Sequence, residues 1–258
     1  MEGYRRNKHY LTKLINDFSS KIVFLQEIWL AYSDFRILQN DFPTLNFQIS
    51  TPDMFMNAED KIGSQGQVWH GAGIAWHDDL NSLVTPLQSN YERFTAVKIN
   101  LGNLKLIAVS LYAPTSGKDD EYLECLSYLA DFLTKNKTTT DLIIIGADWN
   151  CSVKFTPRRK SSLSDFCNTF NLSIHSSNLP TFHHNNLTSE SCIDYFLGSA
   201  DELLKFDGIQ QLCTLDNPEN LSSHDPLLSS VHVLVNNIES HKPTYTNTYT
   251  EFDRKRVV

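Results

Sequence analysis

The sequence has few cysteines, and none of them stands in a Cys-x-x-Cys pair. Their number is odd, and they are scattered along the chain: Cys125, Cys151, Cys167, Cys192 and Cys213. A disulfide framework needs an even set, and zinc sites use closely spaced pairs. We therefore expect neither, and we predict that the thiols are reduced and mostly buried.

Long apolar runs are lacking as well. The apolar run at residues 142–145 is far too short to cross a bilayer, which takes about 20 apolar residues in a helix. The first residues are not followed by the apolar segment of a secretion signal. We expect a soluble, intracellular protein with no membrane partner.

Positive charge is scarce, with 22 Lys and Arg against 30 Asp and Glu and a formal net charge of −8. Proteins bind duplex DNA largely by neutralising phosphates with Lys and Arg, so this balance argues against binding by charge alone. A site for a divalent metal must nevertheless be rich in carboxylates, and the metal then offers positive charge to phosphate. The acidic balance weakens a nuclease function without excluding it.

The 258 residues are enough for one large domain, which we assign to residues 1–235. Residues 236–258 are rich in Asn, Thr and Tyr and are predicted to be a polar tail or linker. Apolar periodicity predicts helices at 7–18, 119–133 and 164–170, a polar loop at 181–190, and strands at 21–29, 71–76, 94–100, 104–112, 141–146, 192–197 and 227–235. This mixture favours an α/β fold with two packed sheets flanked by helices.

Polar side chains follow several predicted strands. Glu27, Tyr112, Asp148 and Asn150 lie at strand ends, and His224 precedes the last strand. Phosphodiester hydrolysis needs hard oxygen ligands for a metal, a group that activates water, and donors that stabilise the leaving oxygen. These residue types suit those tasks, although each alone also fits a solvated strand end, a turn or a surface loop.

Five motifs resemble, in chain order, those of the endonuclease/exonuclease/phosphatase superfamily: Phe-Leu-Gln-Glu27, Ser-Leu-Tyr112-Ala-Pro, Ile-Ile-Gly-Ala-Asp148-Trp-Asn150, Ser191-Cys-Ile-Asp194-Tyr and Ser-Ser-His224-Asp-Pro. They are most similar to the apurinic-type endonuclease domains of non-LTR retrotransposons. The resemblance implies a DNase I-like, four-layer α/β sandwich of two mixed sheets between helices, with the site at one edge.

The resemblance also implies a role for each matching residue. Glu27 would hold Mg²⁺ or Mn²⁺, Asp148 would orient or deprotonate the attacking water, and Asn150 would hold that water or a phosphate oxygen. Asp194 would fix the tautomer of His224 so that its other nitrogen faces the phosphate. Tyr112 would donate to the phosphate or leaving oxygen, and Ser191 is a candidate for substrate contact. Apart from the resemblance, Arg158 and Arg159 follow shortly after Asn150; such residues usually form a solvated basic patch, but here they are candidates for contact with the DNA backbone.

The chain departs from the family's pattern at two places. The family's first strand, with its metal-site Asn, is not found before Gly3. The family's Ser-Asp-His-x-Pro reads Ser222-Ser-His-Asp-Pro here, so Ser223 replaces an Asp and Asp225 offers a carboxylate one residue beyond His224. We expect weaker metal binding, with Asp225 as a second candidate ligand.

The resulting hypothesis is a Mg²⁺- or Mn²⁺-dependent endonuclease that nicks one DNA strand and leaves a 3′-hydroxyl for a linked or separate reverse transcriptase. Such an enzyme would act in the nucleus. Two alternatives stay open: a degenerate, non-catalytic domain, which Ser223 favours, and a phosphoesterase for small molecules, which the acidic composition favours.

Overall fold

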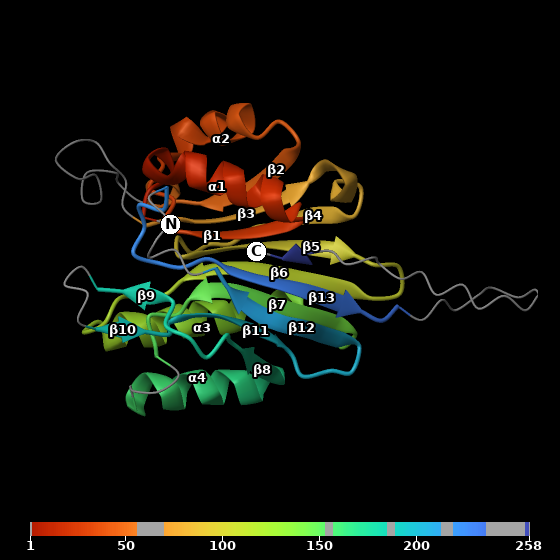
Figure 1. Cartoon of the computed structure of the whole chain (residues 1–258). Helices are drawn as coiled ribbons and strands as arrows, with labels where there is room; N and C mark the ends of the chain where they lie inside the picture. The colour runs from red at the N-terminus through yellow and green to blue at the C-terminus, as the bar shows by residue number, and fades with distance from the viewer. Residues whose placement is uncertain are drawn as a thin grey trace, which may run out of the picture.

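The computed structural model describes residues 2–55, 70–152, 157–184, 189–212, 219–235 and 256–257. Two six-stranded sheets pack face to face between two pairs of helices (Figure 1). The four-layer, DNase I-like α/β sandwich predicted from the sequence is therefore confirmed.

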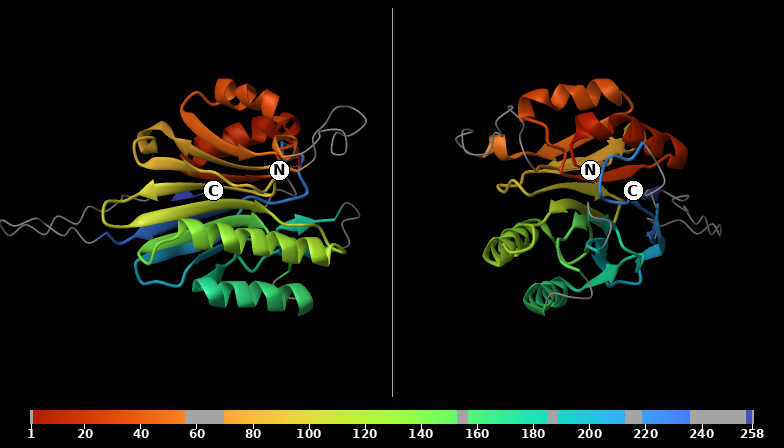
Figure 2. Two further views of the ribbon diagram at one scale, coloured as in Figure 1. Left: turned by 180° about the vertical axis from the view of Figure 1, so that it is seen from behind. Right: turned by 60° about the vertical axis from the view of Figure 1, so that its left-hand side comes forward.

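The first sheet has the strand order β12-β13-β14-β1-β3-β2, and helices α1 and α2 cover its outer face (Figures 1 and 2). Its apolar contacts with these helices form one core, which includes Leu11, Leu38 and Ile49. The bounds are α1 Tyr4–Phe18, β1 Ile22–Gln26, α2 Phe35–Asp41, β2 Leu45–Ser50, β3 Ala72–His77, β12 Leu204–Gln211, β13 Leu227–Val233 and β14 Arg256–Val257, with 3-10 turns at Tyr32–Asp34, Pro52–Met54 and Asp78–Leu80.

The second sheet has the order β4-β5-β6-β7-β11-β8, and helices α3 and α4 lie on its outer face (Figure 2). A second core fills the space between this sheet and its helices, and a third lies between the two sheets. The bounds are β4 Val84–Leu87, β5 Phe94–Asn100, β6 Lys105–Tyr112, α3 Asp119–Asn136, β7 Asp141–Asp148, α4 Pro157–Phe170, β8 Leu172–His175 and β11 Asp194–Ser199; the short pair β9 Phe182–His183 and β10 Glu190–Ser191 lies apart.

The two sheets approach each other closely at Gly146, directly before the predicted catalytic centre. A Cβ atom at this position would lie 2.7 Å from the ring of Phe24 on β1, so only glycine fits without displacing the neighbouring sheet. Gln26 joins the sheets at the same place, because its Nε2 donates to Ser110 Oγ at 2.9 Å and to the Gly146 carbonyl at 3.1 Å. This contact brings the ends of β1 and β7 together.

Three sequence-based expectations differ from the structure or fall outside it. The predicted loop 181–190 contains β9 and β10, and α4 begins seven residues earlier than predicted, at Pro157. Most of the predicted tail 236–258 lies outside the described residues. Within the tail the structure describes only Arg256–Val257, which form β14 between β13 and β1. In the described part of the chain, no helix is both long and apolar enough to span a membrane.

Candidate active site

Three of the predicted site residues lie in one row across the second sheet. Tyr112 ends β6 and pairs in register with Asp148 at the end of β7, which in turn pairs with Asp194 at the start of β11. Side chains in the same row of a sheet point to the same face. The strand pairing alone therefore places these three side chains side by side, although they are up to 82 residues apart in sequence.

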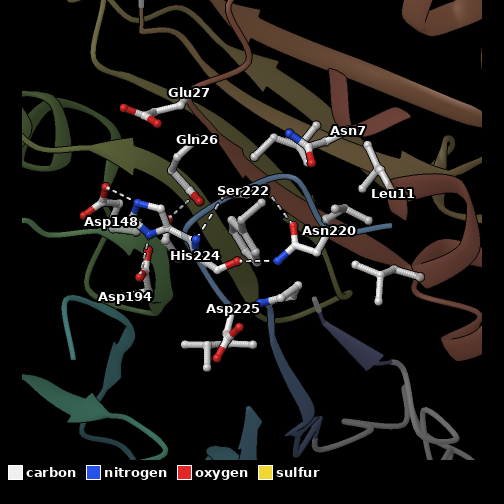
Figure 3. Close-up of a pocket in the computed structure, with 18 of the residues that line it drawn as sticks. Asn7, Leu11, Gln26, Glu27, Asp148, Asp194, Asn220, Ser222, His224 and Asp225 are labelled. Carbon is white, nitrogen blue, oxygen red and sulfur yellow. Dashed lines mark hydrogen bonds and ion pairs between the residues drawn. The ribbon is translucent and has the colours of Figure 1, made fainter. Parts of the chain in front are cut away.

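His224 joins these three residues from the side of the first sheet. It lies in the segment that leads into β13. Its Nδ1 lies 2.9 Å from Asp194 Oδ2, and its Nε2 lies 4.0 Å from Asp148 Oδ2. Figure 3 shows the imidazole between the two carboxylates. The predicted Asp194–His224 pair is thus formed, and it directs the second ring nitrogen toward Asp148.

Burial and charge shift the protonation of this group. Burial raises the pKa of Asp148, and the nearby carboxylates of Asp194 and Glu27 raise it further. Burial alone would lower the pKa of His224, but Asp194 and Asp148 outweigh it and raise this pKa. The raised pKa of His224 favours a positively charged imidazole beside Asp194 at neutral pH, an arrangement that suits contact with a phosphate.

Asn150 and Tyr112 are held at the edge of the same group. Asn150 adopts a positive φ of 46°, its backbone N–H donates to Asp148 Oδ1 at 2.9 Å, and its Nδ2 donates to the Ala113 carbonyl at 2.9 Å. The buried Tyr112 ring stacks on His70 at 5.3 Å, and burial together with the neighbouring Glu27 carboxylate raises the pKa of its hydroxyl. Tyr112 therefore stays a hydrogen-bond donor at neutral pH.

A carboxylate that sequence analysis missed joins this site at the start of the chain. The Glu2 carboxylate accepts hydrogen bonds from Ser223 Oγ at 2.6 Å and from Ser223 N–H at 3.1 Å. Glu2, Glu27 and His224 offer one ligand atom each, and these atoms lie within 4.8 Å of one another. Carboxylate oxygens are the ligands that Mg²⁺ and Mn²⁺ prefer, so Glu2 and Glu27 fit a divalent ion, whereas His224 is already paired with Asp194. The only sequence signal for Glu2 is its place directly before Gly3 and the first helix.

The structure corrects the expectation that Asp225 is a metal ligand. Its side chain is fully buried and pairs with His183, whose Nε2 lies 2.9 Å from Asp225 Oδ2, and the same oxygen accepts from Gln211 Nε2 at 2.6 Å. Figure 3 shows Asp225 directed away from Glu27. A carboxylate moved by one residue along an extended chain points to the opposite side, and it does so here.

Arg159 is also corrected, because it is buried (2% exposed) and cannot reach a substrate. Its guanidinium donates to the carbonyls of Pro114, Thr115 and Asn150 at 2.8 to 2.9 Å and to Asp119 at 2.7 Å. It thereby holds the loops that follow β6 and β7. The neighbouring Arg158 is exposed and pairs with Asp120, and Ser191 is half-buried on β10, so both stay candidates for substrate contact.

Comparisons with known proteins agree with this geometry. A family described as endonuclease-reverse transcriptase matches residues 106–228, which include Tyr112, Asp148, Asp194 and His224. The chain has the endonuclease/exonuclease/phosphatase fold. The resemblance predicted from the sequence is therefore confirmed. No curated protein matches the sequence.

Solved structures of this fold superpose on almost the whole chain. The endonuclease domain of TRAS1, a telomere-specific non-LTR retrotransposon, is 18% identical with a TM-score of 0.61, covering 89% of this chain and 93% of that one. An AP endonuclease from Archaeoglobus fulgidus is 15% identical with a TM-score of 0.64, covering 88% and 95%. The 3′-5′ exonuclease NExo from Neisseria meningitidis is 14% identical with a TM-score of 0.64, covering 90% and 96%. At these identities the likeness establishes the fold, which houses both nucleases and phosphatases.

Proposed function

We propose that this endonuclease/exonuclease/phosphatase-fold protein is a metal-dependent endonuclease that nicks one strand of DNA. The observation that carries the proposal is the group of the buried Asp148 with the half-buried His224 and Asp194, with a 2.9 Å His224–Asp194 contact and a 4.0 Å His224–Asp148 contact. The match to the endonuclease-reverse transcriptase family supports DNA as substrate. A reverse transcriptase, linked or separate, is the partner that this family suggests.

The residues divide the chemistry of hydrolysis between them. Asp148 accepts the proton of the attacking water, and its hydrogen bond from the Asn150 N–H at 2.9 Å fixes its orientation. The positively charged His224, held by Asp194, stabilises the negative charge that develops on the phosphate. Tyr112 donates a proton or hydrogen bond to the leaving oxygen. Glu27 and Glu2 would hold a divalent ion, which would supply positive charge toward the phosphate.

Nicking of supercoiled plasmid in the presence of Mg²⁺ or Mn²⁺ tests the proposal. Asp148→Asn and His224→Ala are each expected to lower the rate by about 10²–10⁴-fold, the usual contribution of a general base or acid. Asp165→Asn, at an exposed carboxylate on α4, and His232→Ala, on β13, are matched controls that should leave the rate unchanged. An activity that survives both site substitutions would place the chemistry elsewhere.

A phosphoesterase acting on small molecules is the second candidate, favoured by the formal net charge of −8. An acidic surface repels the many phosphates of a DNA backbone more strongly than the single phosphate of a small ester. A plasmid-nicking assay with a small phosphomonoester added as competitor separates the two candidate functions. Under the leading proposal, DNA is cleaved and the small ester neither competes nor is hydrolysed.

A further inference from the structure

A short segment of three residues, Thr181–His183, lies across the site beside the chain that carries His224. The His183 N–H donates to the Ser223 carbonyl at 2.9 Å, and the Asp225 N–H donates to the Thr181 carbonyl at 2.8 Å. This antiparallel pairing puts Phe182 opposite His224. The backbone position of His224 is therefore set by the 181–183 segment.

The side chains of the pair strengthen this attachment. His183 Nε2 lies 2.9 Å from Asp225 Oδ2, and His183 Nδ1 lies 3.1 Å from Glu190 Oε1. The Asp225 side chain is 0% exposed, and a buried carboxylate is tolerated only when it is paired and hydrogen-bonded. Because side chains alternate along extended chain, Asp225 points away from the site while its neighbour His224 points into it. Asp225 thus anchors the segment from behind.

The same segment also fixes the carboxylate partner of His224. Thr181 Oγ1 accepts hydrogen bonds from the Asp194 N–H at 3.0 Å and from the Ile193 N–H at 3.1 Å. The Phe182 ring packs against the His224 ring with 4.8 Å between centroids. One short element therefore locates both halves of the Asp194–His224 pair.

We propose that His183 is a positioning residue, which pairs with Asp225 and thereby holds His224 against Asp194. The inference rests on the proposed function in that His224 acts on the substrate. Loss of the His183 imidazole leaves the buried Asp225 with the neutral Gln211 amide as a donor but without its cationic partner, so the segment 223–225 moves toward water to hydrate the carboxylate. The His224–Asp194 contact, now 2.9 Å, then lengthens, and His224 no longer faces the phosphate.

Two substitutions of similar size and polarity separate positioning from a general loss of packing. In His183→Gln, the amide nitrogen reaches about as far as Nε2 and keeps a donor toward Asp225. In His183→Asn, it reaches only as far as Nδ1, toward Glu190. His232→Asn is the matched control, because this histidine lies near the end of β13, eight residues beyond His224, with its Nε2 4.0 Å from Asp207 Oδ2.

The expected result is a selective effect on turnover. His183→Asn should lower the kcat of nicking by about 10–100-fold with little change in KM, as is usual for residues that orient a catalytic group, while His183→Gln and His232→Asn stay close to the parent. In NMR spectra of the ion-free protein, the downfield ring proton that His224 shares with Asp194 should persist in His183→Gln and disappear in His183→Asn.

The proposal is overturned if His183→Asn keeps both this proton signal and the parent kcat, or if His183→Gln loses as much as His183→Asn. The NMR measurement needs no cleavage, so a folded chain that does not nick DNA refutes the proposed function while the proton signal still decides the role of His183. If His183→Asn does not fold, Asp225→Asn removes the charge at constant size. A His224 proton and kcat unchanged in that variant overturn the proposal equally.

Discussion

Replacing Glu2 by glutamine tests whether this carboxylate serves the metal or only the fold. In the structure, both carboxylate oxygens of Glu2 accept from Ser223, and one of them lies within 4.8 Å of a Glu27 oxygen and a His224 nitrogen. Ser223 stands where the resembling family has an Asp. The Glu2 carboxylate therefore lies beside Ser223, at the position where the Ser-Asp-His-x-Pro motif would supply an Asp carboxylate.

The magnitude follows from the charges and hydrogen bonds around Glu2 in the ion-free protein. The Glu2 and Glu27 oxygens lie within 4.8 Å of each other and repel by about 3 kcal/mol at an effective dielectric constant of 20, and the positively charged His224 within the same distance attracts Glu2 by a similar amount. Glu2→Gln removes both contributions and weakens the hydrogen bonds to Ser223, which are worth about 1.5–3 kcal/mol when one partner is charged. Because the repulsion and the attraction largely cancel, we expect the free energy of unfolding without metal to fall by no more than about 1.5–3 kcal/mol.

Metal binding should weaken as well. Loss of one of two carboxylate ligands is expected to raise the Kd for Mn²⁺ at least tenfold, or about 1.4 kcal/mol. Titration calorimetry measures this affinity, and urea unfolding with and without Mn²⁺ measures the stability. Glu202→Gln, at an exposed turn between β11 and β12, is the control. Adding Ser223→Asp to Glu2→Gln restores a carboxylate beside Glu27 and should recover most of the affinity.

The opposite pattern would refute this reasoning. If Glu2→Gln lowers the stability of the ion-free protein and leaves the Mn²⁺ affinity unchanged, Glu2 only caps the loop that contains Ser223. Failure of Ser223→Asp to restore affinity in the double variant would likewise show that this position does not face the metal.

Two further predictions concern buried charges near the site. Arg159→Ala should lower the free energy of unfolding by about 3–5 kcal/mol, because it removes a buried guanidinium that donates to three carbonyls and to Asp119. The exposed Arg158→Ala should change it by less than about 0.5 kcal/mol, and equal effects in urea unfolding would contradict the assignment of Arg159 to the fold. Burial alone would lower the pKa of His183, but Asp225 and Glu190 outweigh burial and raise this pKa. The ion pairs of His183 therefore stabilise the fold fully below the ordinary histidine pKa of about 6.5, and this stabilisation is lost as pH rises through the raised pKa. The difference in unfolding free energy between the parent and His183→Gln should therefore shrink between pH 6 and pH 9, and a difference that is constant or grows with pH would be inconsistent with a charged His183.

The sequence by itself identified the strands at the centre of each sheet. Strands β5, β6 and β7 were predicted within a few residues, because a strand buried on both faces is a continuous apolar run. The four edge strands of the two sheets, β2, β4, β8 and β12, were not predicted, and neither were the two-residue strands β9, β10 and β14. Edge strands are partly solvated and carry polar residues and Pro86, so their apolar pattern is weak.

The site divides in the same way. Sequence motifs were enough to select Glu27, Tyr112, Asp148, Asp194 and His224, because each follows or precedes a recognisable buried strand. The Glu2–Ser223 contact joins residues 221 positions apart, and the His183–Asp225 pair joins residues 42 apart. Neither pairing leaves a local pattern, since only the packing of the two sheets and the antiparallel pairing of residues 181–183 with 223–225 bring these groups together. The sequence thus identified the candidate groups for the chemistry, and the tertiary structure decided which carboxylates lie together near His224 and which pair behind it.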